Sequence, residues 1–134
     1  MPDEKPILLV DDEETVLDLL ADYLDTKGLK AIKCPDPCQV IDLIRQHAIE
    51  VVVLDYFMPQ RNGLAVLQEI NAYAAQTSCP VQVIMLTAQI DGKVALELLR
   101  HNAFLYMNKP PKFRDFLNAV KTAGEKYREL SAGR

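Results

Sequence analysis

Acidic side chains close two short apolar runs in this sequence of 134 residues. Asp11 and Asp12 follow residues 7–10, and Asp55 follows residues 51–54. If the two runs end at the same place, three carboxylates gather there, and unit charges about 5 Å apart repel by roughly 3 kcal/mol at an effective dielectric constant near 20. Mg²⁺, which prefers oxygen ligands, would relieve that repulsion. The acids therefore indicate a cation site.

A hydroxyl and a basic side chain occupy comparable positions later in the chain. Thr87 closes the largely apolar stretch 80–86, and Lys109 comes shortly after residues 103–107. A carboxylate nucleophile, a divalent cation, a hydroxyl and an ammonium are together suited to form and stabilise an acyl phosphate. Each residue alone has an ordinary explanation, since acids favour the start of a helix and most lysines are solvated. Their succession at the ends of apolar runs makes Asp55 the candidate nucleophile.

The apolar runs themselves predict five β-strands. Residues 51–54 are continuously apolar and rich in β-branched valine, as in a strand buried on both faces. Residues 29–33 instead alternate apolar and basic side chains, as an edge strand does. The predicted strands span residues 6–10, 29–33, 51–55, 80–86 and 103–107.

A helical spacing of apolar residues follows each predicted strand. The first helix starts at Glu13, its apolar stripe includes Leu19, and Gly28 is its stop signal. Asp36 before Pro37 predicts the N-cap of the second helix. The second helix is expected to end near residue 47, the third to follow Asn62-Gly63, the fourth to span 92–100, and the fifth to start at Phe113 and fray from residue 131.

Five alternations of strand and helix predict one doubly wound α/β domain, with a core of about residues 5–128 and a tail of about 129–134. The carboxyl ends of parallel strands share one edge of the sheet, where ligands bind. We therefore expect an exposed Asp55 at a shallow site on this edge. The side chains expected to converge there are Asp11, Asp12, Asp55, Thr87 and Lys109.

Composition narrows the function. The net charge of −4, without a cluster of Lys or Arg, argues against direct binding of nucleic acid. No apolar stretch approaches the roughly 20 residues of a membrane span, and the N-terminal acids and prolines do not resemble a signal peptide, so a cytoplasmic location is expected. Cys34, Cys38 and Cys79 lack metal-ligand spacing and are interpreted as reduced thiols.

The ordered motifs strongly resemble those of the receiver (response-regulator, CheY-like) domain of two-component signal transduction, over about residues 5–128. They are Val10-Asp11-Asp12, Asp55-x-x-Met58-Pro59-x-x-Asn62-Gly63, Thr87-Ala88 and Tyr106-x-x-Lys109-Pro110. The resemblance implies a three-layer (βα)5 flavodoxin-like fold, with a parallel sheet in the strand order 2-1-3-4-5. It also implies a phosphoacceptor signalling module, which is not an enzyme beyond its own phosphorylation and dephosphorylation.

The resemblance assigns a role to each motif residue at the metal. Asp55 would be the phospho-acceptor and would also contact Mg²⁺. Asp12 would be a direct Mg²⁺ ligand, and Asp11 would act in the same acidic pocket, often through water. The main-chain carbonyl of Phe57 would also reach the metal.

The same resemblance implies a conformational switch. Thr87 would bond a phosphoryl oxygen, Lys109 would pair with the phosphoryl charge, and the Lys109–Pro110 peptide bond would be cis. Tyr106 would be the switch aromatic that turns inward when Thr87 moves, although a half-buried packing ring is the simpler interpretation. Phosphorylation adds charge and acceptor oxygens that can favour one of two packings.

Three positions depart from the common pattern or vary within the family. Phe57, two residues after Asp55, and Gln89, two residues after Thr87, are expected to tune the lifetime of the phosphoryl group. Asn102 stands where the family usually has Gly, and Asn tolerates the left-handed conformation better than most residues.

The implied partners are a sensor histidine kinase or a histidine phosphotransfer protein, and a downstream protein or effector domain that binds the face around residues 91–128. The resemblance also allows homodimer formation on phosphorylation.

The sequence alone leaves other classes of function open. The segment 11–15 imitates the nucleophile motif of a haloacid-dehalogenase phosphatase, and the fold also serves flavodoxin-like cofactor binders and silent interaction modules.

Overall fold

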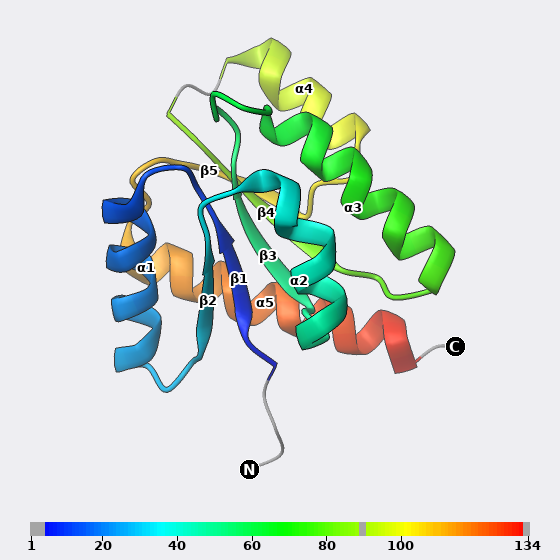
Figure 1. Cartoon of the computed structure of the whole chain (residues 1–134), viewed down its shortest axis with the longest axis horizontal. Helices are drawn as coiled ribbons and strands as arrows, with labels where there is room; N and C mark the ends of the chain where they lie inside the picture. The colour runs from blue at the N-terminus through cyan, green and yellow to red at the C-terminus, as the bar shows by residue number, and fades with distance from the viewer. Residues whose placement is uncertain (1–4, 89–90, 133–134) are drawn as a thin grey trace.

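Five parallel strands form the centre of the computed structural model, which describes residues 5–88 and 91–132. The strands are β1 (Ile7–Val10), β2 (Ala31–Cys34), β3 (Val51–Asp55), β4 (Gln82–Thr87) and β5 (Leu105–Asn108). They are hydrogen-bonded in the order β2-β1-β3-β4-β5, with β3 in the middle (Figure 1). The predicted fold class and strand order are therefore confirmed.

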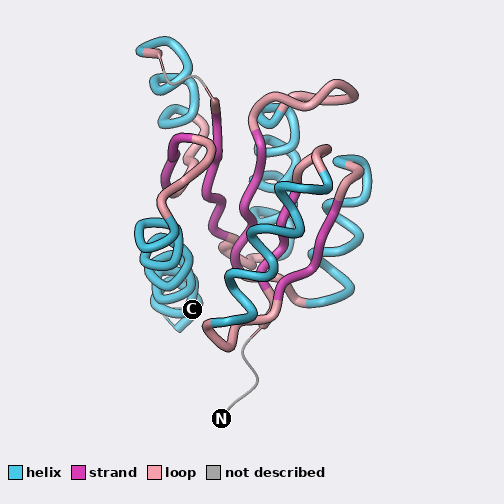
Figure 2. The backbone as a smooth tube through the Cα atoms, turned by 90° about the vertical axis from the view of Figure 1, so that its left-hand side faces the viewer, coloured by secondary structure: helices cyan, strands magenta, loops and turns pink. Residues whose placement is uncertain are grey.

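Helices cover both faces of this sheet. They are α1 (Glu14–Thr26), the short 3₁₀ helix η1 (Pro37–Gln39), α2 (Val40–His47), α3 (Gly63–Thr77), α4 (Gly92–Arg100) and α5 (Phe113–Ala132). One buried cluster joins the sheet to α2, α3 and α4, and a second joins it to α1 and α5. Figure 2 shows the strands enclosed by helices.

Alternation along each strand divides the core between the two faces, because successive side chains of a strand point in opposite directions. In β3, Val52 and Leu54 join the cluster under α2–α4, whereas Val51 and Val53 join the cluster under α1 and α5. This is why the central strands have continuous apolar runs. The sheet thereby places the last residue of β3 at a fixed point of its carboxyl edge.

The β3–α3 connection returns tightly to the end of β3. The N–H of Gly63 donates to the carbonyl of Tyr56 at 2.7 Å, and the side chain of Asn62 caps α3 by accepting from Ala65 N–H at 2.9 Å. A Cβ atom on Gly63 would lie 2.6 Å from the carbonyl oxygen of Asp55 and 2.7 Å from Cα of Tyr56. The turn that carries Asp55 therefore requires glycine at this position.

Two turns bear out their sequence signals. Gly28, just beyond α1, has φ +77°, and Asn102, just beyond α4, has φ +63°. Both are in the left-handed region that glycine and asparagine tolerate. The Lys109–Pro110 peptide bond is cis, as the family resemblance implies.

Several local predictions were wrong. Asp36 is the N-cap with Pro37 at the first helical position, as predicted, but the first turn is the 3₁₀ helix η1 and α2 starts only at Val40. The fifth helix continues to Ala132 without fraying at 131. Leu19, placed in the apolar stripe of the first helix by its spacing, is 50 % exposed.

Across the described ranges 5–88 and 91–132, no helix is both long and apolar enough to cross a membrane.

Candidate functional site

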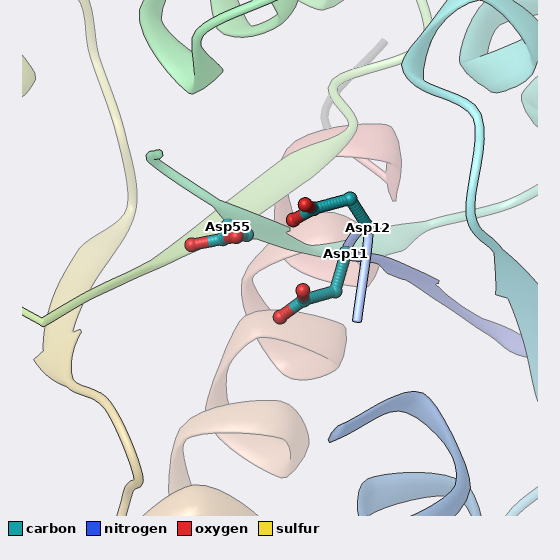
Figure 3. Close-up of side chains that lie close together, drawn as sticks. All are labelled: Asp11, Asp12 and Asp55. Atoms are coloured by element: carbon teal, nitrogen blue, oxygen red, sulfur yellow. The ribbon is translucent and has the colours of Figure 1, made fainter. Parts of the chain in front are cut away.

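Three carboxylates gather where β1 and β3 end. Asp11 and Asp12 directly follow β1, and Asp55 is the last residue of β3, the neighbouring strand. One carboxylate oxygen from each lies within 4.8 Å of the others. Figure 3 shows these side chains grouped at the strand ends. The predicted convergence of the three acids is confirmed.

Burial distinguishes the three acids from one another. Asp11 and Asp55 are both only 3 % exposed, and Asp12 is half-buried. The expectation of an exposed Asp55 was therefore wrong, because Asp11 and Lys109, which come from distant segments of the chain, lie beside its carboxylate.

Backbone N–H groups orient the two buried carboxylates. Oδ1 of Asp11 accepts from Glu13 N–H at 2.9 Å, and Oδ1 of Asp55 accepts from Phe57 N–H at 3.3 Å. In both residues the donor lies two positions later, so the turn after each strand fixes the acid at its end. The second oxygen of each carboxylate is left for other partners.

Lys109 provides the positive charge of the site. Its Nζ lies 2.9 Å from Oδ2 of Asp11, 2.9 Å from Oε1 of Glu13 and 3.3 Å from Oδ2 of Asp55. The backbone holds the residue in place, because Lys109 N–H donates to the carbonyl of Thr87 at 3.0 Å. Lysine was expected here from the end of the fifth strand, and it lies beside both buried acids.

The ionisation of these groups is strongly perturbed. Burial, followed by the charge of Asp11, raises the pKa of Asp55 to about 6 despite the opposing effect of Lys109. Burial likewise raises the pKa of Asp11. Burial alone would lower the pKa of Lys109, but the carboxylates of Asp11 and Glu13 outweigh it, so that this pKa is raised and the ammonium stays charged. The site therefore lacks positive charge relative to its acids.

The donor set fits Mg²⁺. All three clustered ligands are carboxylates, and Mg²⁺ takes oxygen ligands and retains several waters. Oδ2 of Asp11 and Oδ2 of Asp55 are buried without a hydrogen bond of adequate geometry among the described residues, and their contact with Lys109 is an ion pair. A cation would satisfy these oxygens and relieve the repulsion that raises the pKa of Asp55.

Thr87 and Tyr106 lie on the two strands beyond β3. Thr87 ends β4, is fully buried, and pairs in register with Asn108 of β5. Tyr106 pairs in register with Met85, is half-buried, and packs against the core cluster under α2–α4. A hydroxyl at the end of β4 and an aromatic ring on β5 are thus present where the sequence predicted them.

Of the two candidate rate-tuning residues, only Phe57 lies in the part of the chain that the structure describes. Phe57 is 51 % exposed, and its ring lies edge-on to that of Tyr56 with centroids 4.7 Å apart. A large, exposed apolar side chain therefore stands two residues after Asp55, on the residue whose N–H binds the Asp55 carboxylate. Gln89 lies outside the described residues.

Sequence reasoning missed two side chains of this region. Glu13 was assigned to the helix start, yet its carboxylate binds Lys109. Tyr56 was given no role, yet its hydroxyl donates to Glu97 of α4 at 3.3 Å. Glu13 could have been found from the unbroken acidic run 11–14 at a strand end. The Tyr56 contact joins residues 41 positions apart and left no sequence signal.

Comparison with known proteins agrees with this geometry. The family model of the response regulator receiver domain matches residues 7–121. The probable C4-dicarboxylate response regulator DctR of Priestia megaterium is 30 % identical over 126 residues, which are 92 % of this chain and 52 % of that protein. The chain thus spans about half the length of this curated relative.

Solved structures of receiver domains have the same fold. A receiver domain protein from Clostridium thermocellum superposes with a TM-score of 0.84 at 26 % identity, covering 95 % of this chain and 99 % of that one. The beryllofluoride-activated NtrC4 receiver domain dimer has a TM-score of 0.81 at 26 % identity and covers 92 % of this chain and 99 % of that one. The motifs, the fold and the family match agree, and this chain belongs to the family of response regulator receiver domains.

Proposed function

We propose that this receiver domain accepts a phosphoryl group on Asp55 from a histidine kinase or a histidine phosphotransfer protein. The observation that carries the proposal is the placement of Lys109 Nζ between the buried carboxylates of Asp11 and Asp55, at 2.9 Å and 3.3 Å. A carboxylate beside a fixed ammonium and two further acids is suited to receive a group whose added charge needs compensation.

The transfer balances as a displacement at phosphorus. An oxygen of the Asp55 carboxylate attacks the phosphorus of a phosphohistidine, an O–P bond forms, and the P–N bond breaks. The electron pair of that bond stays on the imidazole nitrogen, which takes a proton. The product is an acyl phosphate, and the charge at residue 55 changes from about −1 to about −2.

In this proposal, side chains of the receiver domain stabilise the added negative charge. Lys109 pairs with one phosphoryl oxygen, and the Thr87 hydroxyl donates to another. Asp11 and Asp12, with Asp55 and the main-chain carbonyl of Phe57, would hold Mg²⁺, which supplies charge neutralisation during transfer. The domain acts as a phosphoacceptor rather than an enzyme beyond its own phosphorylation and dephosphorylation, and Phe57 and Gln89 tune the lifetime of the acyl phosphate.

The output follows from a change in packing. A bond from Thr87 to the phosphoryl group would draw the end of β4 toward Asp55, and Tyr106 on the adjacent β5 would respond by turning inward. The face around residues 91–128 would then bind a downstream protein, an effector domain or a second phosphorylated copy. Residues 5–128 are the receiver core in this proposal.

The test is phosphorylation by a small donor. The chain is incubated with phosphoramidate and Mg²⁺, and its intact mass is measured. We expect a gain of one phosphoryl group that is lost with a chelator and absent in Asp55→Asn. The matched control is Asp42→Asn, whose acid is exposed on α2 and should leave the gain unchanged. No gain in the unsubstituted chain, or a gain that persists in Asp55→Asn, would overturn the proposal.

A further inference from the structure

Glu13 stands at the N-cap of α1 but does not cap the helix with its side chain. Its backbone is extended, with φ −94° and ψ 109°, and its carbonyl accepts from the N–H groups of Val16 and Leu17 at 3.1 Å and 3.2 Å. Its carboxylate makes no capping hydrogen bond. It instead accepts a hydrogen bond from Lys109 Nζ at 2.9 Å, across 96 positions of sequence. The carboxylate that was expected to stabilise the start of α1 therefore binds Lys109 at the candidate site instead.

The contacts of Lys109 are of two kinds. An ammonium group has three N–H donors, and three carboxylates lie within 3.3 Å of Nζ. Nζ is 2.9 Å from Oε1 of Glu13 in a hydrogen bond, and it forms ion pairs with Oδ2 of Asp11 at 2.9 Å and Oδ2 of Asp55 at 3.3 Å. With three carboxylates around three N–H donors, Glu13 occupies a donor that a new anion on Asp55 would need.

The solvent exposure of the three carboxylates determines which of them can most easily break its contact with Lys109. The side chain of Glu13 is 57 % exposed, whereas those of Asp11 and Asp55 are 4 % and 3 % exposed. Water can solvate the Glu13 carboxylate when it leaves Lys109, but the two buried acids have no such replacement. An exposed ion pair is also weak, so that its exchange costs little.

We propose that Glu13 is a positioning residue that competes for Lys109. Its carboxylate holds the ammonium in the unphosphorylated domain and is displaced when an anionic group is added to Asp55. Glu13 thereby lowers the affinity of the site for that group. This inference rests on the proposed phosphorylation of Asp55.

The probe is beryllofluoride, an anion that binds a carboxylate oxygen as a phosphoryl group would. The full chain is titrated with it in Mg²⁺, and ¹⁹F NMR follows the bound anion. We expect Glu13→Gln to bind roughly two- to fivefold more tightly than the unsubstituted chain, the range that corresponds to an exposed ion pair. Unchanged or weaker binding by Glu13→Gln would overturn the inference.

Two further variants distinguish the effect of the Glu13–Lys109 contact from the effect of negative charge alone. Glu14→Gln removes the same charge from the next residue, in the first turn of α1, and should leave the affinity unchanged. Glu13→Asp keeps the charge but is one methylene shorter, and Asp at an N-cap bonds the first-turn N–H groups instead. It should therefore bind as tightly as Glu13→Gln. An equal gain in Glu14→Gln, or unsubstituted affinity in Glu13→Asp, would contradict a contact effect.

The ammonium itself reports the displacement. In ¹⁵N NMR, hydrogen exchange of Lys109 Nζ should be faster in Glu13→Gln than in the unsubstituted chain before the anion is added, and equal in the two complexes. An effect of the same size in both states would contradict displacement. If the unsubstituted chain binds no beryllofluoride at all, the proposed function fails; if it binds and Glu13→Gln does not differ, only the competition fails.

Discussion

The hydroxyl of Tyr56 lies 3.3 Å from Oε2 of Glu97, so the residue directly after Asp55 contacts the middle of α4. The backbone of Tyr56 is fixed on both sides, because its N–H donates to Leu86 and its carbonyl accepts from Gly63. Among the described residues of α4, Leu98 alone is buried. The Tyr56–Glu97 hydrogen bond therefore adds a polar contact to the packing of Leu98 and Val94 that holds α4 against the sheet.

Tyr56→Phe should loosen α4 without disturbing the sheet. Loss of this hydrogen bond is expected to lower the free energy of unfolding by about 0.5–1.5 kcal/mol. Hydrogen exchange should become faster in residues 92–100 and stay unchanged in β1 and β3. The control is Tyr73→Phe in α3, which removes a hydroxyl that has no hydrogen bond in the part of the chain that the structure describes. Equal loosening in both variants would contradict the role of the Tyr56–Glu97 contact.

Gly63→Ala should destabilise the domain, because the added Cβ would meet the carbonyl of Asp55 at 2.6 Å and Cα of Tyr56 at 2.7 Å. Backbone cannot yield as a side chain does, and a loss of about 1–3 kcal/mol in urea denaturation is expected. Gly92→Ala is the matched control, since nothing lies within 4 Å of its Cβ position at the start of α4. A loss of the same size in Gly92→Ala would show that the close approach at Gly63 is not the cause.

Asp55→Asn should stabilise the metal-free domain in a pH-dependent way. Burial raises the pKa of Asp55 to about 6 from 3.8, so the folded state binds this proton more tightly than the unfolded chain does. The contribution of Asp55 to stability therefore falls as the pH rises from about 4 to about 6, by about 3 kcal/mol at most at roughly 1.4 kcal/mol per pH unit.

Urea denaturation in the presence of a chelator measures this effect. Asparagine does not titrate, and the advantage of Asp55→Asn over the unsubstituted chain should be about 1 kcal/mol larger at pH 7.5 than at pH 5. Asp42→Asn changes an exposed acid and should show no such pH dependence. An advantage of Asp55→Asn that shrinks with rising pH would disprove the sign of the shift.

The three cysteines should differ in reactivity. Cys34 is buried, its Sγ donates to the carbonyl of Asp36 at 3.0 Å, and burial raises its pKa to about 11, whereas Cys38 is exposed. Since the thiolate is the reactive form, a thiol reagent at pH 8 should modify Cys38 at once and Cys34 only as fast as the domain opens. Cys79 is half-buried and should react at an intermediate rate, so Cys38→Ser should remove only the fastest phase. A fast phase that disappears in Cys34→Ser instead would contradict the burial of that thiol.

The local sequence pattern was sufficient to predict the strands of this domain. The apolar runs that end in Asp11, Asp55 and Thr87 identified strands that the structure contains, because alternate residues of a doubly covered strand both meet apolar helices. The order of strands and the site they share came from the family motifs together with the geometry of parallel sheets. Parallel pairing and the family motifs together were thus enough to predict that these side chains meet at one edge.

Only the tertiary structure determined that Asp55 is buried at the carboxyl edge of the sheet and which side chains contact Lys109 there. Asp55 lies beside Asp11 and Lys109 from distant segments, and the contacts of Lys109 with Glu13 and of Tyr56 with Glu97 join residues 96 and 41 positions apart. Periodicity reports which face of an element is apolar. It carries no information on which polar side chain reaches another across the molecule, because that depends on packing angles and distances set by the whole fold.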